Sequence, residues 1–197
     1  MNKKILLFDI DDCILRSRPQ DIGIWKEKDG KKERLTTAEF AEDSDKGKPG
    51  VKYDYWEFED PEIVRRSIMN GTPILRNLRI MDEYINKGYD CAFLTARGCE
   101  DVIKDAMASF LKYRDEDGRL QDIKDRLNVS LSHAVNDEKY MEVLDGLKDY
   151  DRKAKIIKTI SEMYDKVTFI DDDFKNIIAA EKMNLPNVEI IHVEKRD

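Results

Sequence analysis

The amino-acid sequence predicts an α/β fold in which a parallel sheet carries helices on both faces. After residue 72, short apolar runs of strand length alternate with longer segments whose apolar residues recur at helical spacing. That alternation is typical of parallel strands joined by crossover helices. The first apolar run, residues 5–8, is continuous, as in a strand that is buried on both faces. Acidic residues follow it directly, and the carboxyl end of such a strand is where open α/β sheets bind ligands.

The remaining elements follow from the same patterns of hydrophobicity. Strands are predicted at residues 4–8, 89–94, 127–131, 167–170 and 188–193. Helices are predicted at residues 73–87, 100–113, 138–147, 153–164 and 175–183. Pro73 suits the first turn of a helix, and Gly88 is typical of a helix C-terminus. The highly charged segment 114–125 is assigned no element.

An insertion is predicted between the first strand and the first helix, over residues 16–72. The Asp-Gly pair at residues 29–30 lies between segments of alternating apolar and polar residues, which predicts a small β-hairpin over residues 22–36. Residues 53–58 alternate again and are rich in aromatic side chains, so that they form either an edge strand or a lip that faces the substrate. We therefore predict a single domain, residues 1–197, with the insertion as a flap or small cap.

Composition narrows the class of protein. The net charge of −7 argues against general nucleic-acid binding, because such proteins are more often basic. No apolar run approaches the roughly 18–20 residues that span a bilayer, and the run at residues 4–8 is too short for a signal peptide. Cys13, Cys91 and Cys99 do not have the number or spacing of a disulfide framework. We expect a cytoplasmic protein without a membrane partner.

Residues whose side chains could take part in catalysis or metal binding lie at the predicted strand ends and at one helix start. They are Asp9 and Asp11, Thr95, Lys153, and Asp171 with Asp172. Parallel strands end at one edge of a sheet, so these side chains are expected to converge. Together they supply a carboxylate nucleophile, a second carboxylate, a hydroxyl donor and a fixed cation, which is the set that phosphoryl transfer requires. Crowded carboxylates repel each other unless a cation binds them, which predicts a Mg²⁺ site.

These segments resemble the four motifs of the haloacid dehalogenase-like (HAD) superfamily, in the order that the family has them. Residues 8–14 resemble the first motif, Asp-x-Asp, and residues 93–97 resemble the second, an apolar strand that ends in Thr or Ser. Lys153 matches the lysine of the third, and residues 169–172 resemble the acidic pair of the fourth. The resemblance spans nearly the whole chain. It implies a Rossmann-like fold and a magnesium-dependent phosphatase.

The resemblance also implies a role for each matched residue. Asp9 is implied as the nucleophile that becomes an aspartyl-phosphate, and Asp11 as the general acid and base. Thr95 and Lys153 are implied to hold the phosphoryl group. Mg²⁺ is implied to bind the Asp9 carboxylate, the Asp11 backbone carbonyl and Asp172. Asp171 and Asn176 are placed in the outer shell of the metal.

The Thr-Ala-Arg form of the second motif is similar to phage-type HAD proteins and to the phosphatase domain of polynucleotide kinase. In those proteins the arginine approaches the substrate, which implies substrate-binding roles for Ala96 and Arg97. The substrate is then either a small phosphomonoester, such as a nucleotide or a sugar phosphate, or a nucleic-acid 3′-phosphate end.

Several alternatives stay open at this stage. Residues 171–173 also suit the N-terminal cap of the following helix, and Lys155 is an alternative to Lys153. Arg97 is balanced between substrate contact and a surface ion pair. The alternative function is a Mg²⁺-binding phospho-Asp switch without hydrolysis, or a binding module on the same fold.

Overall fold

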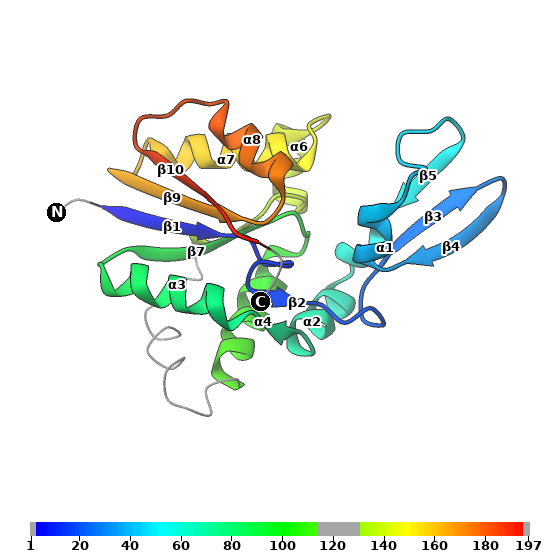
Figure 1. The fold of residues 1–197 in the computed structure, drawn as a ribbon, viewed down its shortest axis with the longest axis horizontal. Coiled ribbons are helices and arrows are strands. Elements are labelled where there is room, and N and C mark those ends of the chain that lie inside the picture. Colours follow the sequence, from blue (N-terminus) through cyan, green and yellow to red (C-terminus); the bar gives the residue numbers. More distant parts are fainter. Residues whose placement is uncertain (1–2, 114–130, 195–197) are drawn as a thin grey trace.

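A central parallel sheet organises the protein. The computed structural model describes residues 3–113 and 131–194, and within them the main sheet has the strand order β10-β9-β1-β7-β8 (Figure 1). Every neighbouring pair in it is parallel. The strands are β1 (Lys4–Phe8), β7 (Asp90–Thr95), β8 (His133–Ala134), β9 (Lys166–Asp171) and β10 (Val188–His192).

Helices cover both faces of this sheet, which confirms the predicted α/β class (Figure 1). On one face lie α2 (Pro61–Met69), α3 (Leu75–Asn86) and α4 (Glu100–Tyr113). On the other lie α6 (Glu138–Leu144), α7 (Asp149–Ser161) and α8 (Phe174–Glu181).

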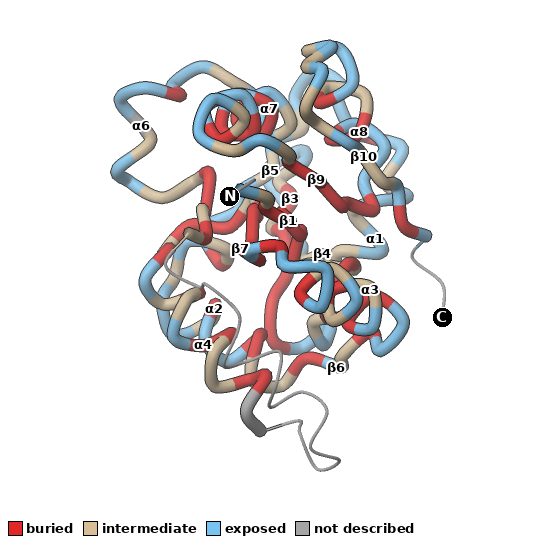
Figure 2. Tube along the Cα trace, turned by 90° about the vertical axis from the view of Figure 1, so that its left-hand side faces the viewer, coloured by how far each residue is buried: buried red, intermediate tan, exposed pale blue. Residues whose placement is uncertain are grey.

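Alternate side chains of β1 build the two halves of the core. Leu6 and Phe8 pack in the cluster that includes α3 and α4, while Ile5 and Leu7 pack in the cluster that includes α7. Figure 2 shows β1 and β9 as largely buried. The continuous apolar run at residues 5–8 is therefore explained by burial on both faces of the sheet, as the sequence predicts.

Some predicted boundaries differ from those of the structure. Pro73 lies in a short strand, β6 (Thr72–Pro73), which pairs with β2 (Leu15–Arg16), and the helix starts after it. Lys153 is in the second turn of α7 rather than at its start, because the helix begins at Asp149. The predicted strand at residues 127–131 lies outside the described residues except for its last residue, as does the segment 114–125.

The predicted hairpin is confirmed and belongs to a small antiparallel sheet. β3 (Ile24–Lys28) pairs with β4 (Lys31–Leu35) on one side and with β5 (Val51–Asp54) on the other. The two turn residues have positive φ, 52° at Asp29 and 73° at Gly30, which is what an Asp-Gly hairpin turn requires. This sheet and α1 (Thr37–Glu42) stand apart from the central sheet (Figure 1).

Residues 53–58 are divided between two structures. The edge-strand interpretation holds only as far as Asp54, where β5 ends. Residues 56–58 instead form a short 3₁₀ helix, η1 (Trp56–Phe58). The Phe58 carbonyl accepts a hydrogen bond from the Gly98 backbone N–H, in the loop after β7, at 3.0 Å. The carbonyl of the next residue, Glu59, accepts one from Cys99 Sγ at 2.9 Å. The insertion is thereby tied to the edge of the central sheet.

Helix α2 was not predicted, although its N-terminal signals are present in the sequence. Asp60 caps it by accepting hydrogen bonds from two backbone N–H groups, and Pro61 occupies the first turn. Val64 and Ile68, four residues apart, are buried in the same core cluster as β1. Residues 61–69 therefore pack on the central body, and the segment 16–72 contributes to the core as well as to the small sheet.

Glu57 fastens the hairpin to η1. Its buried carboxylate accepts hydrogen bonds from the Gly23 backbone N–H at 2.8 Å and from Trp25 Nε1 at 2.7 Å. Arg34 adds two more through Nε and Nη2, both at 2.7 Å. Burial alone would raise the pKa of Glu57, but these donors lower it below its ordinary value, so the carboxylate stays charged.

We expect Glu57→Ala to destabilise the protein by about 2 kcal/mol, because it leaves buried donors and the Arg34 guanidinium without their acceptor. Urea unfolding followed by Trp fluorescence measures this. Glu27→Ala is the matched control, since Glu27 is half-exposed in the same hairpin and pairs with Lys32 at 3.8 Å. Equal midpoints for the two variants would contradict the role given to Glu57.

Candidate active site

The ends of β1 and β9 bring a lysine and two aspartates together. Asp9 follows β1, Asp171 is the last residue of β9, and Lys153 reaches them from α7. Lys153 Nζ donates to Asp9 Oδ1 at 2.8 Å and to Asp171 Oδ2 at 2.8 Å. The side chain of this lysine is 2% exposed, so the contact is shielded from water. By contrast, Lys155 is exposed and directs Nζ to the Val143 carbonyl at 3.4 Å.

Burial and crowding set the charges in this cluster. Burial raises the pKa of Asp9 well above its ordinary value, and although Lys153 opposes the rise, Asp171, Asp172 and Asp11 add to it by repulsion. Burial alone would lower the pKa of Lys153, but Asp171 and Asp9 hold it above the ordinary value, so the lysine stays cationic. The ionised form of Asp9 therefore depends on positive charge close by.

Three carboxylates at this edge are placed to share a cation. Asp9, Asp171 and Asp172 each offer one oxygen, and these atoms all lie within 4.8 Å of one another. Carboxylate oxygens are the ligands that Mg²⁺ prefers, and a divalent cation here would offset the repulsion that raises the pKa of Asp9. The residues therefore fit the predicted metal. The carboxylate of Asp11 is not in this group.

The oxygens of Asp171 are already held by other groups. Besides Lys153, Oδ2 accepts from Asn176 Nδ2 at 2.9 Å, and Oδ1 accepts from the Asp173 backbone N–H at 2.8 Å. Asp173 itself caps α8 by accepting from the Lys175 backbone N–H at 2.8 Å. Capping thus belongs to Asp173, while Asp171 is oriented toward Lys153.

Asp11 lies against Arg97. Arg97 Nε donates to Asp11 Oδ2 at 2.8 Å and Nη2 donates to Asp11 Oδ1 at 2.6 Å, which makes a two-pronged ion pair. Burial alone would raise the pKa of Asp11, but the Arg97 guanidinium holds it below its ordinary value. Arg97 is fully buried, so the surface ion pair that was one of its two expected roles is excluded.

A cavity of about 200 Å³ joins these groups. Asp9, Asp11, Ala96, Arg97, Lys153 and Asp172 are among the residues that line it. Thr95 is not in its wall: the residue is buried, and Oγ1 accepts from the Arg97 backbone N–H at 3.3 Å. The structure therefore places Thr95 behind the cavity, beside the loop that carries Arg97.

The insertion supplies cavity residues that sequence reasoning missed. Ser17, Thr37 and Phe58 line the cavity together with the site residues. Phe58 was noted only as one of several aromatic residues, and nothing in the spacing of Ser17 or Thr37 marks them. Their position depends on contacts between segments that are far apart in the chain, such as the hydrogen bond from the Gly98 backbone N–H to the Phe58 carbonyl.

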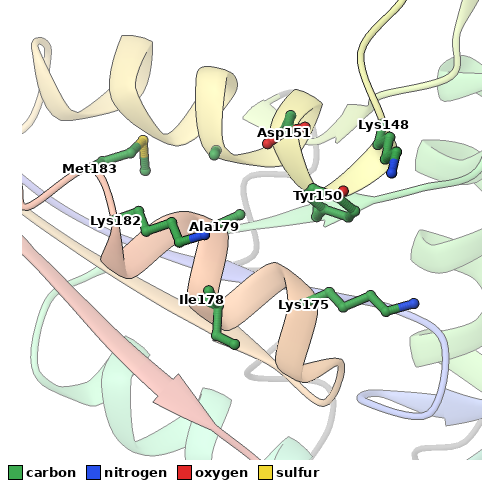
Figure 3. A pocket seen from close by; sticks show the side chains of 9 residues that line it. Lys148, Tyr150, Asp151, Lys175, Ile178, Ala179, Lys182 and Met183 are labelled. Atoms are coloured by element: carbon green, nitrogen blue, oxygen red, sulfur yellow. The ribbon is translucent and has the colours of Figure 1, made fainter.

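A larger cavity, of about 620 Å³, lies between α7 and α8 (Figure 3). Lys148 and Lys175 lie toward one end of it, and Lys182 and Met183 lie toward the other. Asp151 is the one carboxylate in its wall. The larger cavity therefore lacks the grouped carboxylates that line the smaller one. For this reason the candidate active site is the smaller cavity, at Asp9.

Bound Mg²⁺ is expected to raise the melting temperature of the protein, because a ligand that binds only the folded state stabilises it, by about 2.7 kcal/mol at a hundredfold excess over Kd. Asp172→Asn is expected to remove most of the effect, since it removes one carboxylate of the cluster. Asp101→Asn is the control, because Asp101 is exposed on α4. Differential scanning calorimetry with and without Mg²⁺ measures the shift, and an equal shift in Asp172→Asn would contradict the site.

Comparison with known proteins assigns the chain to no family. The chain matches no protein-family model and has no significant match among curated protein sequences. Within residues 3–113 and 131–194, none of the helices is long and apolar enough to cross a membrane. The function is therefore inferred from the side chains that meet around Asp9.

Proposed function

We propose that this protein is a Mg²⁺-dependent, HAD-like phosphomonoester hydrolase that acts through an aspartyl-phosphate on Asp9. The observation that supports this most strongly is the setting of the buried Asp9. Its carboxylate accepts a hydrogen bond from Lys153 Nζ at 2.8 Å, and one of its oxygens lies within 4.8 Å of an oxygen of Asp171 and of Asp172. A carboxylate nucleophile needs such a setting, because its charge must be retained in a buried site and a dianionic substrate must be attracted to it.

The proposed reaction consists of two half-reactions, with Asp9 as the nucleophile and Asp11 as the general acid and base. In the first, an Asp9 oxygen attacks phosphorus and the bond to the leaving oxygen breaks. Asp11, which must enter this step protonated, gives that oxygen its proton and becomes the carboxylate that Arg97 holds. In the second, Asp11 takes a proton from water, the water oxygen attacks phosphorus, and the bond to Asp9 breaks to release inorganic phosphate. Lys153 keeps Asp9 ionised and faces the cavity, where it offsets charge on the phosphoryl oxygens. Mg²⁺ at the carboxylates supplies further neutralisation of that charge when bound.

The substrate proposed is a small phosphomonoester, such as a nucleotide or sugar phosphate, or a nucleic-acid 3′-phosphate end, in a cytoplasmic setting. The cavity of about 200 Å³ supports a site built around the phosphoryl group, with the rest of the substrate extending past the residues of the insertion. A small leaving group would contact Phe58 and Thr37 on that side.

Phosphate release from a substrate panel, with and without Mg²⁺, tests this function. The panel contains p-nitrophenyl phosphate, nucleoside monophosphates, sugar phosphates and a 3′-phosphorylated oligonucleotide. Mg²⁺-dependent release from at least one compound is expected, and the preferred compound identifies the substrate class. Lack of release from all of them, with lasting phosphorylation of Asp9, would instead indicate a phospho-Asp switch.

A further inference from the structure

Arg97 is buried at the edge of the central sheet, where it also lines the smaller cavity. It follows β7 and its residue exposure is 0%. Besides the two hydrogen bonds to Asp11, Nη1 donates to Ser67 Oγ at 2.7 Å and Nη2 donates to Ser17 Oγ at 2.9 Å. The Phe58 ring lies 5.9 Å from the guanidinium carbon. Each of the three guanidinium nitrogens thus has at least one acceptor within the protein.

These contacts fix the guanidinium in one orientation. Its two-pronged edge is occupied by both oxygens of Asp11, and its opposite nitrogen is anchored to Ser67 on α2. A phosphoryl oxygen that used the same edge would have to displace Asp11. A planar guanidinium with paired donors instead defines where a carboxylate lies and how it is rotated.

We infer that Arg97 is a positioning residue for Asp11 and does not bind the phosphoryl group. This inference rests on the proposed function and departs from the substrate contact that the sequence resemblance implies. Ser67 acts through Arg97, since it is fully buried and does not line the cavity. The segment 61–69 therefore contributes to proton transfer by anchoring the arginine that orients Asp11.

The two possible roles of Arg97, positioning Asp11 and binding the substrate, predict different losses of kcat/KM when Arg97 is replaced. If Arg97 orients the general acid, its removal slows the loss of leaving groups that need a proton and spares those that do not. If Arg97 binds the phosphoryl group, its removal slows all substrates alike and weakens the binding of inorganic phosphate. The value of kcat/KM separates these cases, because it reports the step in which the leaving group departs.

The test compares kcat/KM across aryl phosphates whose phenols range from strong to weak acids. For Arg97→Lys and Arg97→Met, we expect losses of about 10²-fold with the weakest acids as leaving groups and below about threefold with the strongest. Lysine is expected to fail as methionine does, because it cannot donate both bonds to one carboxylate. Inhibition by inorganic phosphate should stay within about threefold of wild type, since no charged hydrogen bond to phosphate is lost.

Ser67→Ala keeps the test decisive if the Arg97 variants fail to fold. It removes one small hydroxyl, and we expect a loss of several-fold that is again confined to poor leaving groups. Arg65→Met is the matched control: Arg65 is on the same helix, half-exposed and paired with Asp105 at 2.6 Å, so its removal should leave the leaving-group dependence unchanged.

Two results would overturn the inference in different ways. Equal losses for all leaving groups, with weaker inhibition by inorganic phosphate, would make Arg97 a substrate ligand while leaving the phosphatase function intact. A folded wild-type protein without activity toward any aryl phosphate or any other compound of the substrate panel would refute the proposed function, and the role of Arg97 with it.

Discussion

Asp9→Asn is expected to reduce phosphate release by at least about 10⁴-fold, because an amide cannot replace the carboxylate nucleophile. The substitution keeps the size of the side chain and its place at the end of β1, so substrate access should be unchanged. Steady-state assays with the best substrate of the panel, at saturating Mg²⁺, measure the loss. Asp60→Asn is the control, since asparagine also caps a helix and Asp60 lies at the start of α2.

The stability of Asp9→Asn distinguishes loss of chemistry from loss of fold. Burial and repulsion by Asp171, Asp172 and Asp11 raise the pKa of Asp9 in the folded protein. The ionised carboxylate therefore lowers the free energy of unfolding. Without Mg²⁺, the variant is therefore expected to be at least as stable as wild type. A stable variant that retained near-normal Mg²⁺-dependent activity would show that Asp9 is not the nucleophile.

The second large effect is expected for Lys153→Met, with a loss of activity on the order of 10³-fold and of stability of about 3 kcal/mol. Lys153 donates to both Asp9 and Asp171, and removing it leaves two buried carboxylates without this cation. The pKa of Asp9 would then rise further, which depletes the ionised nucleophile. Enzyme assays and urea unfolding of the same preparation give the two quantities.

Lys155→Met provides a close control for this experiment. It removes an equivalent charge two residues along the same helix, but Lys155 is exposed and bonds to a backbone carbonyl. Its activity and unfolding midpoint should match those of wild type. A larger loss in Lys155→Met than in Lys153→Met would move the cation of the site to Lys155 and contradict the geometry described above.

The sequence was sufficient to predict the class of the fold and part of the site, for a topological reason. Parallel strands end at one edge, so the acidic residues that follow the strands at 4–8 and 167–170 were expected to converge. The direct pairing of these two strands in the structure brings them together. The hairpin was predictable because its Asp-Gly turn is a local signal. Such features depend on residues that are close in the chain.

The missed contacts around Arg97 join residues that are far apart in the sequence. The pairing of Asp11 with Arg97 joins residues 86 positions apart, and its anchor, Ser67, has no motif of its own. Helix α2 did have a local signal in Asp60 and Pro61, but it lies in a segment whose hairpin and loop signals are typical of a flap. The second-turn position of Lys153 was missed because the start of α7 is marked by no side-chain cap.

Detection of the covalent intermediate tests the central claim most directly. Asp11→Asn is mixed with Mg²⁺ and an aryl phosphate whose phenol is a strong acid, so that formation of the intermediate does not need a proton from residue 11. The reaction is quenched in acid and digested, and the phosphorylated peptide is identified by mass spectrometry. Slower removal of phosphate from the enzyme should let the intermediate accumulate, with the phosphate on Asp9 and no label in Asp9→Asn. Continued phosphate release by wild type, with no label on Asp9 at any quench time in either protein, would contradict the aspartyl-phosphate mechanism.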